Sequence, residues 1–486
     1  MFQALSERIR RDRDMPERAW RIAVLSAVLD GTIYDTLRHG FHDERTDGGE
    51  YIPLRDRRPS VRYNLSRIVV DDTVALLFGE GRFPAITAPD KAASESMADL
   101  VAECCINHTM RAAAFTGSVG SSAVLFRILR ERPFVNVLDT RFLTPVWDPE
   151  APDVLIRVIE RYKVRGRDLQ ARGYAIDHDD LGADHWFMRA WDAEAETWFL
   201  PQPVHRDEAM QPDPQRSVTH ALGFVPVVWM RNLPGGDDTD GACTFRPAIE
   251  TQIEIEYQLS QAGRGLKYSS DPLLMLREPA APTGGPMLRS ASNAVLVSEK
   301  GDAKLLEING TAAGAVVEYV RALREMALES CHGNRSNADK VSAAQSGRAL
   351  ELLHQPLLQV TDMLRISYGT EGLLPLMRMI AAASHRVPLR LRNTTLRRLD
   401  ADSLGLRWPA WFSPTAGDKQ VQATTLTVLR DAGHISRETA VNVVAHNYDI
   451  EDVPAELARI EADEAEAAER AVSVGAQVKG ALKVEE

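Results

Sequence analysis

The stretch SCHGNRSNADKVSAAQSGRALELLHQPLLQVTDML (330–364) joins a polar segment directly to a strongly periodic one. Residues 334–346 contain almost no side chain that a protein core would bury. The apolar residues that follow recur at steps of three and four, the spacing of one helix face: Leu350, Leu353, Leu357, Val360 and Leu364. The sequence therefore predicts a polar loop that leads at once into a long helix.

Two places in this helix are expected to disturb it. Pro356 lacks the backbone N–H that a helix interior uses, at a cost of roughly 3 kcal/mol unless packing offsets it. Gly369, Gly372 and Pro375 mark a second weak point. A helix that continued to His385 would be about 55 Å long at ~1.5 Å per residue. The sequence leaves open where the helix bends, and whether it is one helix.

Another helix is expected over residues 245–267, well before the loop. Ile249, Ile253 and Tyr257 form one apolar stripe along it. Three glutamates mark its polar side: Glu250, Glu254 and Glu256. A helix with this pattern packs along one face and exposes the other.

A β segment and a second helix follow before the loop. Residues 271–309 predict β structure, with a hairpin turn at Glu299–Asp302. Residues 311–331 predict a helix with Thr311 as its N-cap. The order is thus helix, small β insertion, helix, polar loop and long helix.

The remaining chain is helical at both ends and strand-rich between. Helices are expected over 63–81 and, as one continuous run, over Lys91–Val119, whereas 123–228 reads as short strands. From Asp418 the chain is helical again, and we expect a disordered tail beyond Ser473. The predicted fold class is α+β.

Composition describes an ordinary globular chain. With 486 residues, 44% of them hydrophobic and 26% charged, more than one unit is expected. A formal net charge of −12 argues against a protein that grips nucleic acid over its whole surface. Four scattered cysteines indicate a reducing compartment. The N-terminus has no apolar core of a signal peptide, and no stretch approaches 18 consecutive apolar residues, so no membrane partner is expected.

The order of these parts resembles the portal proteins of tailed double-stranded DNA bacteriophages. The resemblance runs from about Tyr63 to Ala471. Its pieces are Asn64 with Ile68–Asp72 and Leu76–Gly79, then GFVPVVWMRN (223–232), SGRALELL (346–353) and the late AGHISRETA…PAELARIEADE. Each piece alone is weak, and their order and spacing carry the resemblance.

The resemblance implies a division of the chain into named parts. These are the wing (1–243), first stem helix (244–270), clip (271–310), second stem helix (311–332), tunnel loop (333–346), long helix with returning wing strands (347–417), helical crown (418–472) and tail (473–486).

It also implies a function and partners. Portal subunits form a ring of about twelve copies at one capsid vertex. Double-stranded genomic DNA is packaged and ejected through that ring. The expected partners are the terminase large subunit, then the head–tail connector, and the major capsid protein. The location is the virion, after assembly in the bacterial cytoplasm. No catalytic residue, metal or cofactor is expected.

The candidate site residues lie in the loop and in the clip. The loop offers short polar groups of both charge signs, which suit a sliding polyanion: Asn334, Arg335, Ser336, Asn337, Asp339, Lys340 and Ser342. In the clip, three cations face either DNA or a protein partner: Arg277, Arg289 and Lys300.

Other interpretations carry less support. Cys104, Cys105 and His108 lack a second ligand pair for zinc. GSVGSS (117–122) lacks the Lys-Ser/Thr of a phosphate loop. AGHISRETAVNVVAHN (432–447) has one arginine in its second helix, a poor footprint for a DNA-reading motif. A phage-associated acidic hydrolase or nuclease, and a head–tail adaptor, remain the alternatives.

Overall fold

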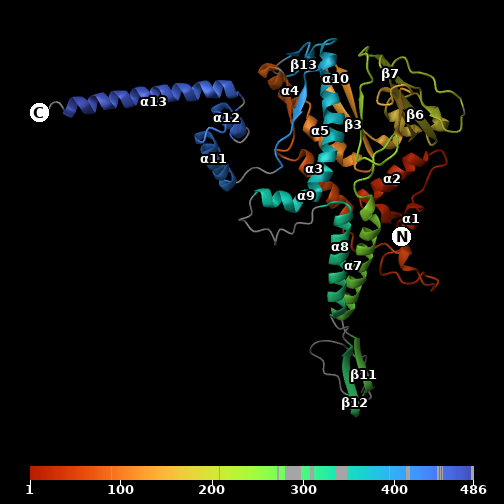
Figure 1. Ribbon diagram of the computed structural model, residues 1–486. Coiled ribbons are helices and arrows are strands. Elements are labelled where there is room, and N and C mark those ends of the chain that lie inside the picture. Colours follow the sequence, from red (N-terminus) through yellow and green to blue (C-terminus); the bar gives the residue numbers. More distant parts are fainter. Residues whose placement is uncertain are drawn as a thin grey trace. The chain divides into compact units, whose positions relative to one another are not determined.

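The computed structural model describes the chain except for residues 89, 207, 271–272, 280–296, 307–310, 334–346, 393–394, 412–415, 446–447, 449, 451 and 483–486. The chain forms two compact units. Unit 1 is Met1–Arg335 with Gln355–Pro409, and unit 2 is Ser336–His354 with Ala410–Glu486. Helices and sheets are mixed, so the α+β prediction is confirmed (Figure 1).

Helices dominate the first part of unit 1. They are α1 (Phe2–Ser6), α2 (Glu17–Leu29), η1 (Ile33–Thr36), η2 (Leu54–Asp56), α3 (Leu65–Phe78), α4 (Lys91–Glu103) and α5 (Ile106–Gly117). The run predicted as one helix over Lys91–Val119 is two helices, because Cys105 adopts a left-handed conformation with φ 50°. The prediction of a continuous helix there is wrong.

Two antiparallel sheets make up the strand-rich region. The first has the order β10-β2-β3, from β2 (Ser121–Leu129), β3 (Arg132–Leu138) and β10 (Val227–Arg231). The second has six strands, in the order β4-β5-β6-β7-β9 with β8 beside β6. Its strands are β4 (Leu143–Trp147), β5 (Leu155–Arg165), β6 (Asp184–Trp191), β7 (Ala195–Trp198), β8 (Gln202–Pro203) and β9 (Val218–Thr219). Short helical turns join them: η3 (Thr140–Phe142), α6 (Gly166–Ala171) and η4 (His178–Asp180).

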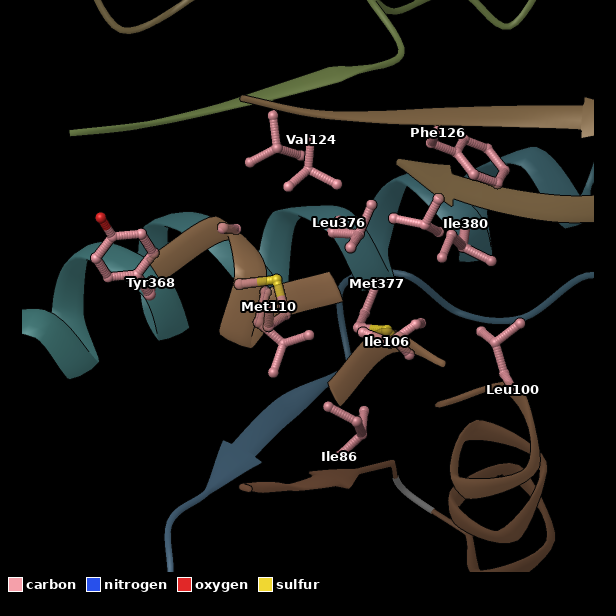
Figure 2. Close-up of a cluster of buried hydrophobic side chains, with 14 of the residues drawn as sticks. Ile86, Leu100, Ile106, Met110, Val124, Phe126, Tyr368, Leu376, Met377 and Ile380 are labelled. Carbon is pink, nitrogen blue, oxygen red and sulfur yellow. The ribbon is translucent and has the colours of Figure 1, made fainter. Parts of the chain in front are cut away.

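Later segments return to complete this body. The short strand β15 (Gly405–Arg407) pairs with β1 (Ala85–Thr87), and β13 (Leu389–Arg390) pairs with β14 (Thr395–Leu396). Figure 2 shows the main core, where side chains of the helical residues 368–380 pack against side chains of α5 and β2. These core residues are fully buried: Ile106, Met110, Val124, Phe126, Tyr368, Leu376, Met377 and Ile380.

The long helix continues through three helical segments. They are α9 (Gly347–Leu364), the π-helical segment η7 (Arg365–Leu373) and α10 (Leu374–Ser384). Pro356 lies inside α9, which stays α-helical around it. The α-helical hydrogen bonding changes instead in η7, which contains Gly369 and Gly372 of the second predicted weak point. There, a Cβ on Gly372 would lie 2.5 Å from Met230 Sδ, so only glycine fits.

A buried ion pair fastens the N-terminal helices to the first sheet. Arg18 Nε and Nη2 lie 2.8 and 2.7 Å from the Asp240 carboxylate, which is 4% exposed. Ser121 Oγ donates to the same carboxylate at 2.5 Å. Arg18 Nη1 also donates to the carbonyls of Thr140 and Leu143. One guanidinium thus joins α2, η3 and the start of β2.

Replacing Asp240 by alanine is expected to destabilise unit 1 by about 3–5 kcal/mol, because the guanidinium of Arg18 loses its countercharge inside the protein. Asp71→Ala is the matched control, since Asp71 forms an exposed pair with Arg67 within α3. That change should cost about 0.5 kcal/mol. Urea unfolding followed by tryptophan fluorescence measures the free energy of unfolding of both variants. Equal losses of stability would contradict the role of Asp240 as the buried partner of Arg18.

Unit 2 consists of helices with little buried surface. The helices of its tail are α11 (Ala416–Asp431), α12 (Arg437–Ala445) and α13 (Val453–Leu482). Gly433 has φ 70° after α11, and Ser436 Oγ accepts from Thr439 N–H, so both predicted caps are confirmed. The chain is helical to Leu482, so the expectation of a disordered tail beyond Ser473 is wrong for that stretch.

Candidate functional site

A two-helix hairpin leaves the body of unit 1. After the turn η5 (Arg246–Ala248), α7 (Ile249–Ser270) runs out and α8 (Thr311–Ser330) runs back beside it. With 22 and 20 residues, the helices span about 33 and 30 Å at ~1.5 Å per residue. The strands β11 (Leu273–Pro279) and β12 (Val297–Leu306) lie between them in the chain and pair at the far end of the hairpin (Figure 1).

Apolar side chains anchor the root of this hairpin. On α7, Ile255 packs with Leu65 and Val69 of α3. On α8, three residues join the same cluster: Leu323, Ala327 and Leu328. The predicted stripe of Ile249, Ile253 and Tyr257 packs against the N-terminal helices instead. Two faces of α7 are therefore buried near its start.

A buried polar network also holds the root. Glu256 is 1% exposed and accepts from the backbone N–H of Asn64 at 2.8 Å and from Tyr34 Oη. Gln252 Oε1 accepts from both the N–H and the hydroxyl of Ser66, at 2.8 and 2.6 Å. The prediction that Glu256 lies on the polar side of the helix is wrong. Its partners lie about two hundred positions earlier, where helical periodicity gives no signal.

Burial raises the pKa of Glu256 above its ordinary value of 4.5, although the hydrogen bonds from Tyr34 and Asn64 oppose the shift. The folded chain therefore holds this proton to a higher pH than the unfolded chain does. Stability contributed by the protonated form is complete below pH 4.5 and is lost as the pH rises through the folded pKa.

We accordingly expect wild type to lose stability relative to Glu256→Gln as the pH rises above 4.5, because glutamine does not ionise. Urea midpoints of both proteins between about pH 4 and pH 8 measure the difference. Glu254→Gln, at a half-exposed position of the same helix, controls for the change of net charge. A difference between wild type and Glu256→Gln that did not vary with pH would contradict this account.

Outside the root cluster, the hairpin exposes large apolar side chains. On α8, Val317, Tyr319 and Met326 are 44%, 46% and 54% exposed. Tyr319 and Met326 are seven residues apart and share one face of the helix. Among the described side chains of α7, the last buried one is Ser260, and Gln261 and Gly263 are exposed. The hairpin thus carries apolar surface that the described chain does not cover.

The β pair at the end of the hairpin differs from the predicted one. β12 is a single strand paired with β11, and Arg277 stands opposite Asp302. The expected turn at Glu299–Asp302 is wrong, because this stretch lies within β12. Its extra residues are accommodated where the register shifts between Arg277 and Pro279. Lys300 lies in that irregular stretch, and Arg289 lies outside the described residues.

The seven predicted loop residues all lie outside the described residues: Asn334, Arg335, Ser336, Asn337, Asp339, Lys340 and Ser342. The structure fixes the point at which the chain reaches them. His332 has φ 51°, and Gly333 N–H donates to the Leu328 carbonyl at 2.7 Å, which terminates α8. Gly333 is buried beside Leu328 and Val69. The polar segment therefore starts from a packed point at the root of the hairpin.

One cavity in the described part of the chain, of about 970 Å³, lies between residues 12–19 and the second sheet. Two of the cations that line it form ion pairs within the protein. Lys163 Nζ lies 3.3 and 3.0 Å from Asp12 and Asp14, and Arg141 lies 2.5 Å from Asp139. The carboxylates of Asp12, Asp14 and Asp139 thus neutralise part of the positive charge at this cavity.

Asp71 and Asp237 are each followed in the sequence by a second aspartate, and each forms an ion pair with an arginine. Although burial acts to raise it, hydrogen bonds from Arg21 and from two backbone N–H groups lower the pKa of Asp237 to about 2. Asp71 pairs with Arg67. A carboxylate held ionised in this way does not share a proton with a neighbour.

The described residues offer little to a metal or a membrane. No three His, Cys, Asp or Glu side chains among them gather to hold a metal ion. Cys104 Sγ lies 3.6 Å from the Pro133 carbonyl, and burial raises the pKa of this thiol to about 11. None of the helices in the described ranges is long and apolar enough to cross a membrane.

Comparison with known proteins gives a weak structural likeness. No family model matches the chain. No curated protein matches it either. A solved chain described as part of the "Virion of native gene transfer agent (GTA) particle" is similar over 79% of this chain and 89% of that chain, at 11% identity and a TM-score of 0.37. A likeness at this level does not establish a shared fold.

Proposed function

We propose that this chain is a portal-type subunit: a non-enzymatic protein that assembles into a ring through which double-stranded DNA passes at one vertex of a phage capsid. The proposal rests on the sequence resemblance and on the hairpin of α7 and α8. It adopts the division of the chain into wing, stem, clip, tunnel loop, long helix and crown given above.

The observation that carries the proposal is the apolar surface on the hairpin. Tyr319 and Met326 are about half exposed on α8, whereas Leu323 between them is buried in the root cluster. In proteins, most of the stability of a helix comes from packing of its apolar face rather than from helix propensity. In a ring, each hairpin would gain a neighbour on either side and bury this surface.

The helices of unit 2 support assembly independently. Within the described part of the chain, α11 buries no residue, although it carries Val421 and Val428 at 67% and 62% exposure. These two valines are seven residues apart and share one face. A second copy of this chain would cover such a face in a ring.

The proposal assigns roles to the predicted site residues. Residues 334–346 would face the DNA, where short polar groups make transient contacts with phosphates. Arg277, Arg289 and Lys300 would lie in the clip, where the terminase large subunit and then the head–tail connector dock. The wing would contact the major capsid protein. An acidic chain, with net charge −12, suits a conduit that must release DNA.

An acidic nuclease is the rival from another class. It would cleave DNA in the presence of a divalent metal, whereas a portal subunit would leave DNA intact under the same conditions. Incubating the purified chain with linear DNA and Mg²⁺ or Mn²⁺ separates the two functions. A metal-dependent DNA-cleaving activity that copurified with the chain would favour the nuclease.

Counting copies per particle tests the proposed function itself. A portal subunit is expected at about twelve copies per particle, against on the order of hundreds for a shell protein. Quantitative mass spectrometry of purified particles measures the ratio to the major capsid protein. A ratio near one, or the absence of the chain from particles, would overturn the proposal.

A further inference from the structure

Four segments of unit 1 meet in a surface rich in arginine. They are the β2–β3 turn, the end of α10, the β13–β14 hairpin and the segment after β14. Together they carry seven arginines: Arg130, Arg132, Arg386, Arg390, Arg392, Arg397 and Arg398. All seven are exposed. We call these seven residues the arginine surface.

Backbone hydrogen bonds hold the four segments together. Arg390 N–H donates to the Glu131 carbonyl at 2.8 Å, which joins β13 to the β2–β3 turn. Arg398 N–H donates to the Ser384 carbonyl at 3.2 Å, which returns the hairpin to the end of α10. Arg392 N–H donates to Glu103 of α4 at 2.6 Å. Figure 1 shows β13 and the end of α10 side by side. The charges are therefore gathered on a fixed scaffold.

Few carboxylates oppose these charges. Glu131 lies 2.5 Å from Arg390, and Glu103 lies 3.8 Å from Arg132. No described carboxylate forms an ion pair with Arg130, Arg392, Arg397 or Arg398. The five arginines of this surface that have no ion-pair partner among the described residues repel one another, which costs stability. A bound polyanion would offset that repulsion.

We infer that the arginine surface binds the phosphate backbone of double-stranded DNA without sequence preference. Arginine presents a planar fork of donors that matches phosphate oxygens in pairs. The leucines of the same segments are turned inward: Leu389, Leu391 and Leu396 are buried. The surface is thus cationic with little apolar area, which suits a phosphate backbone better than the apolar centre of a protein interface.

An acidic protein surface is the other class of partner. Leu129 and Phe134, at 50% and 40% exposure, lie beside the arginine surface on β2 and β3. A protein partner would use these side chains, whereas duplex DNA would not. Because these two apolar side chains are present, DNA binding and protein binding by this surface must be compared directly.

The triple variant Arg130→Glu/Arg392→Glu/Arg397→Glu tests the inference in the full-length chain. These side chains have no ion-pair partner among the described residues, so the fold should survive. The probe is a fluorescent duplex of about 30 base pairs, titrated at about 50 and about 200 mM salt. We expect affinity to fall at least about tenfold, and the slope of log K against log salt to lose about three units.

A matched control carries the same change of net charge elsewhere. Arg10→Glu/Arg55→Glu/Arg167→Glu reverses three exposed arginines outside the arginine surface, and its affinity should stay within about twofold of wild type. The neutral variant Arg130→Gln/Arg392→Gln/Arg397→Gln should show an intermediate loss. Equal losses in the two Glu variants, or no loss in either, would overturn the inference.

A third measurement separates DNA from protein. Leu129→Ser/Phe134→Ser should bind the duplex as wild type does. If this variant lost DNA binding, or if the triple Glu variant kept DNA binding and lost only the major capsid protein, the surface would be a protein interface. The inference does not depend on the channel: a ring that assembled without this DNA contact would overturn it and leave the proposed function standing.

Discussion

A chain carrying Tyr319→Glu and Met326→Glu is expected to remain folded and to lose all higher assembly. Both side chains lie on one face of α8, about half exposed in the single chain. In a ring, each glutamate would be buried against a neighbouring hairpin without a countercharge. Unpaired charges in an interface cost several kcal/mol each, and every interface of the ring would carry them.

Arg321→Glu provides the matched control for this variant. Arg321 lies on the same helix, 69% exposed in its pair with Glu318, and its replacement changes the net charge by the same amount. Assembly should persist in the control. Size-exclusion chromatography with light scattering gives the mass, and circular dichroism reports folding. A double variant that still assembled would place the subunit contact elsewhere.

Deleting Asn334–Ala344 is expected to leave the ring intact and to prevent stable DNA packaging. The segment begins just after Gly333, which is packed at the root of the hairpin and remains in the deleted chain. Particles assembled with the deleted chain should contain little nuclease-protected DNA. Quantitative PCR of nuclease-treated particles measures this directly.

A length-matched variant separates chemistry from chain length. Replacing Arg335, Asp339 and Lys340 by serine keeps thirteen residues in 334–346 and removes the charges. We expect an intermediate packaging defect, because short polar groups remain. If the deletion instead prevented assembly, the segment would be a structural joint, and its assignment to the channel would be wrong.

Periodicity predicted the helices well, because a helix that packs along one face records that face in its own sequence. The stripe of Ile249, Ile253 and Tyr257 is buried as expected. The caps at Gly433 and Ser436 also follow from local chemistry. Local rules failed at Cys105, where a left-handed residue interrupts an otherwise helical pattern.

Contacts between distant segments could not be predicted in this way. Glu256 is polar by type, and only the fold brings Tyr34 and Asn64 to it. The register of β12 was missed because its partner strand lies across the Gly/Pro-rich residues 280–296. Pairing across such a gap has no signal within either strand.

The arginine surface had a sequence signal that the strand interpretation obscured. Residues 386–398 contain five arginines within thirteen positions. Alternation with leucine at Leu389 and Leu391 predicts short strands, and it also places the charges on the outer face. Only the fold adds Arg130 and Arg132 from the β2–β3 hairpin to the same surface.

Imaging of the purified full-length chain tests the central claim most directly. Negative-stain electron microscopy, with native mass spectrometry of the same sample, is expected to reveal a closed ring of about twelve copies with a central opening. A stable monomer under all conditions, including in the presence of the capsid proteins, would contradict the account.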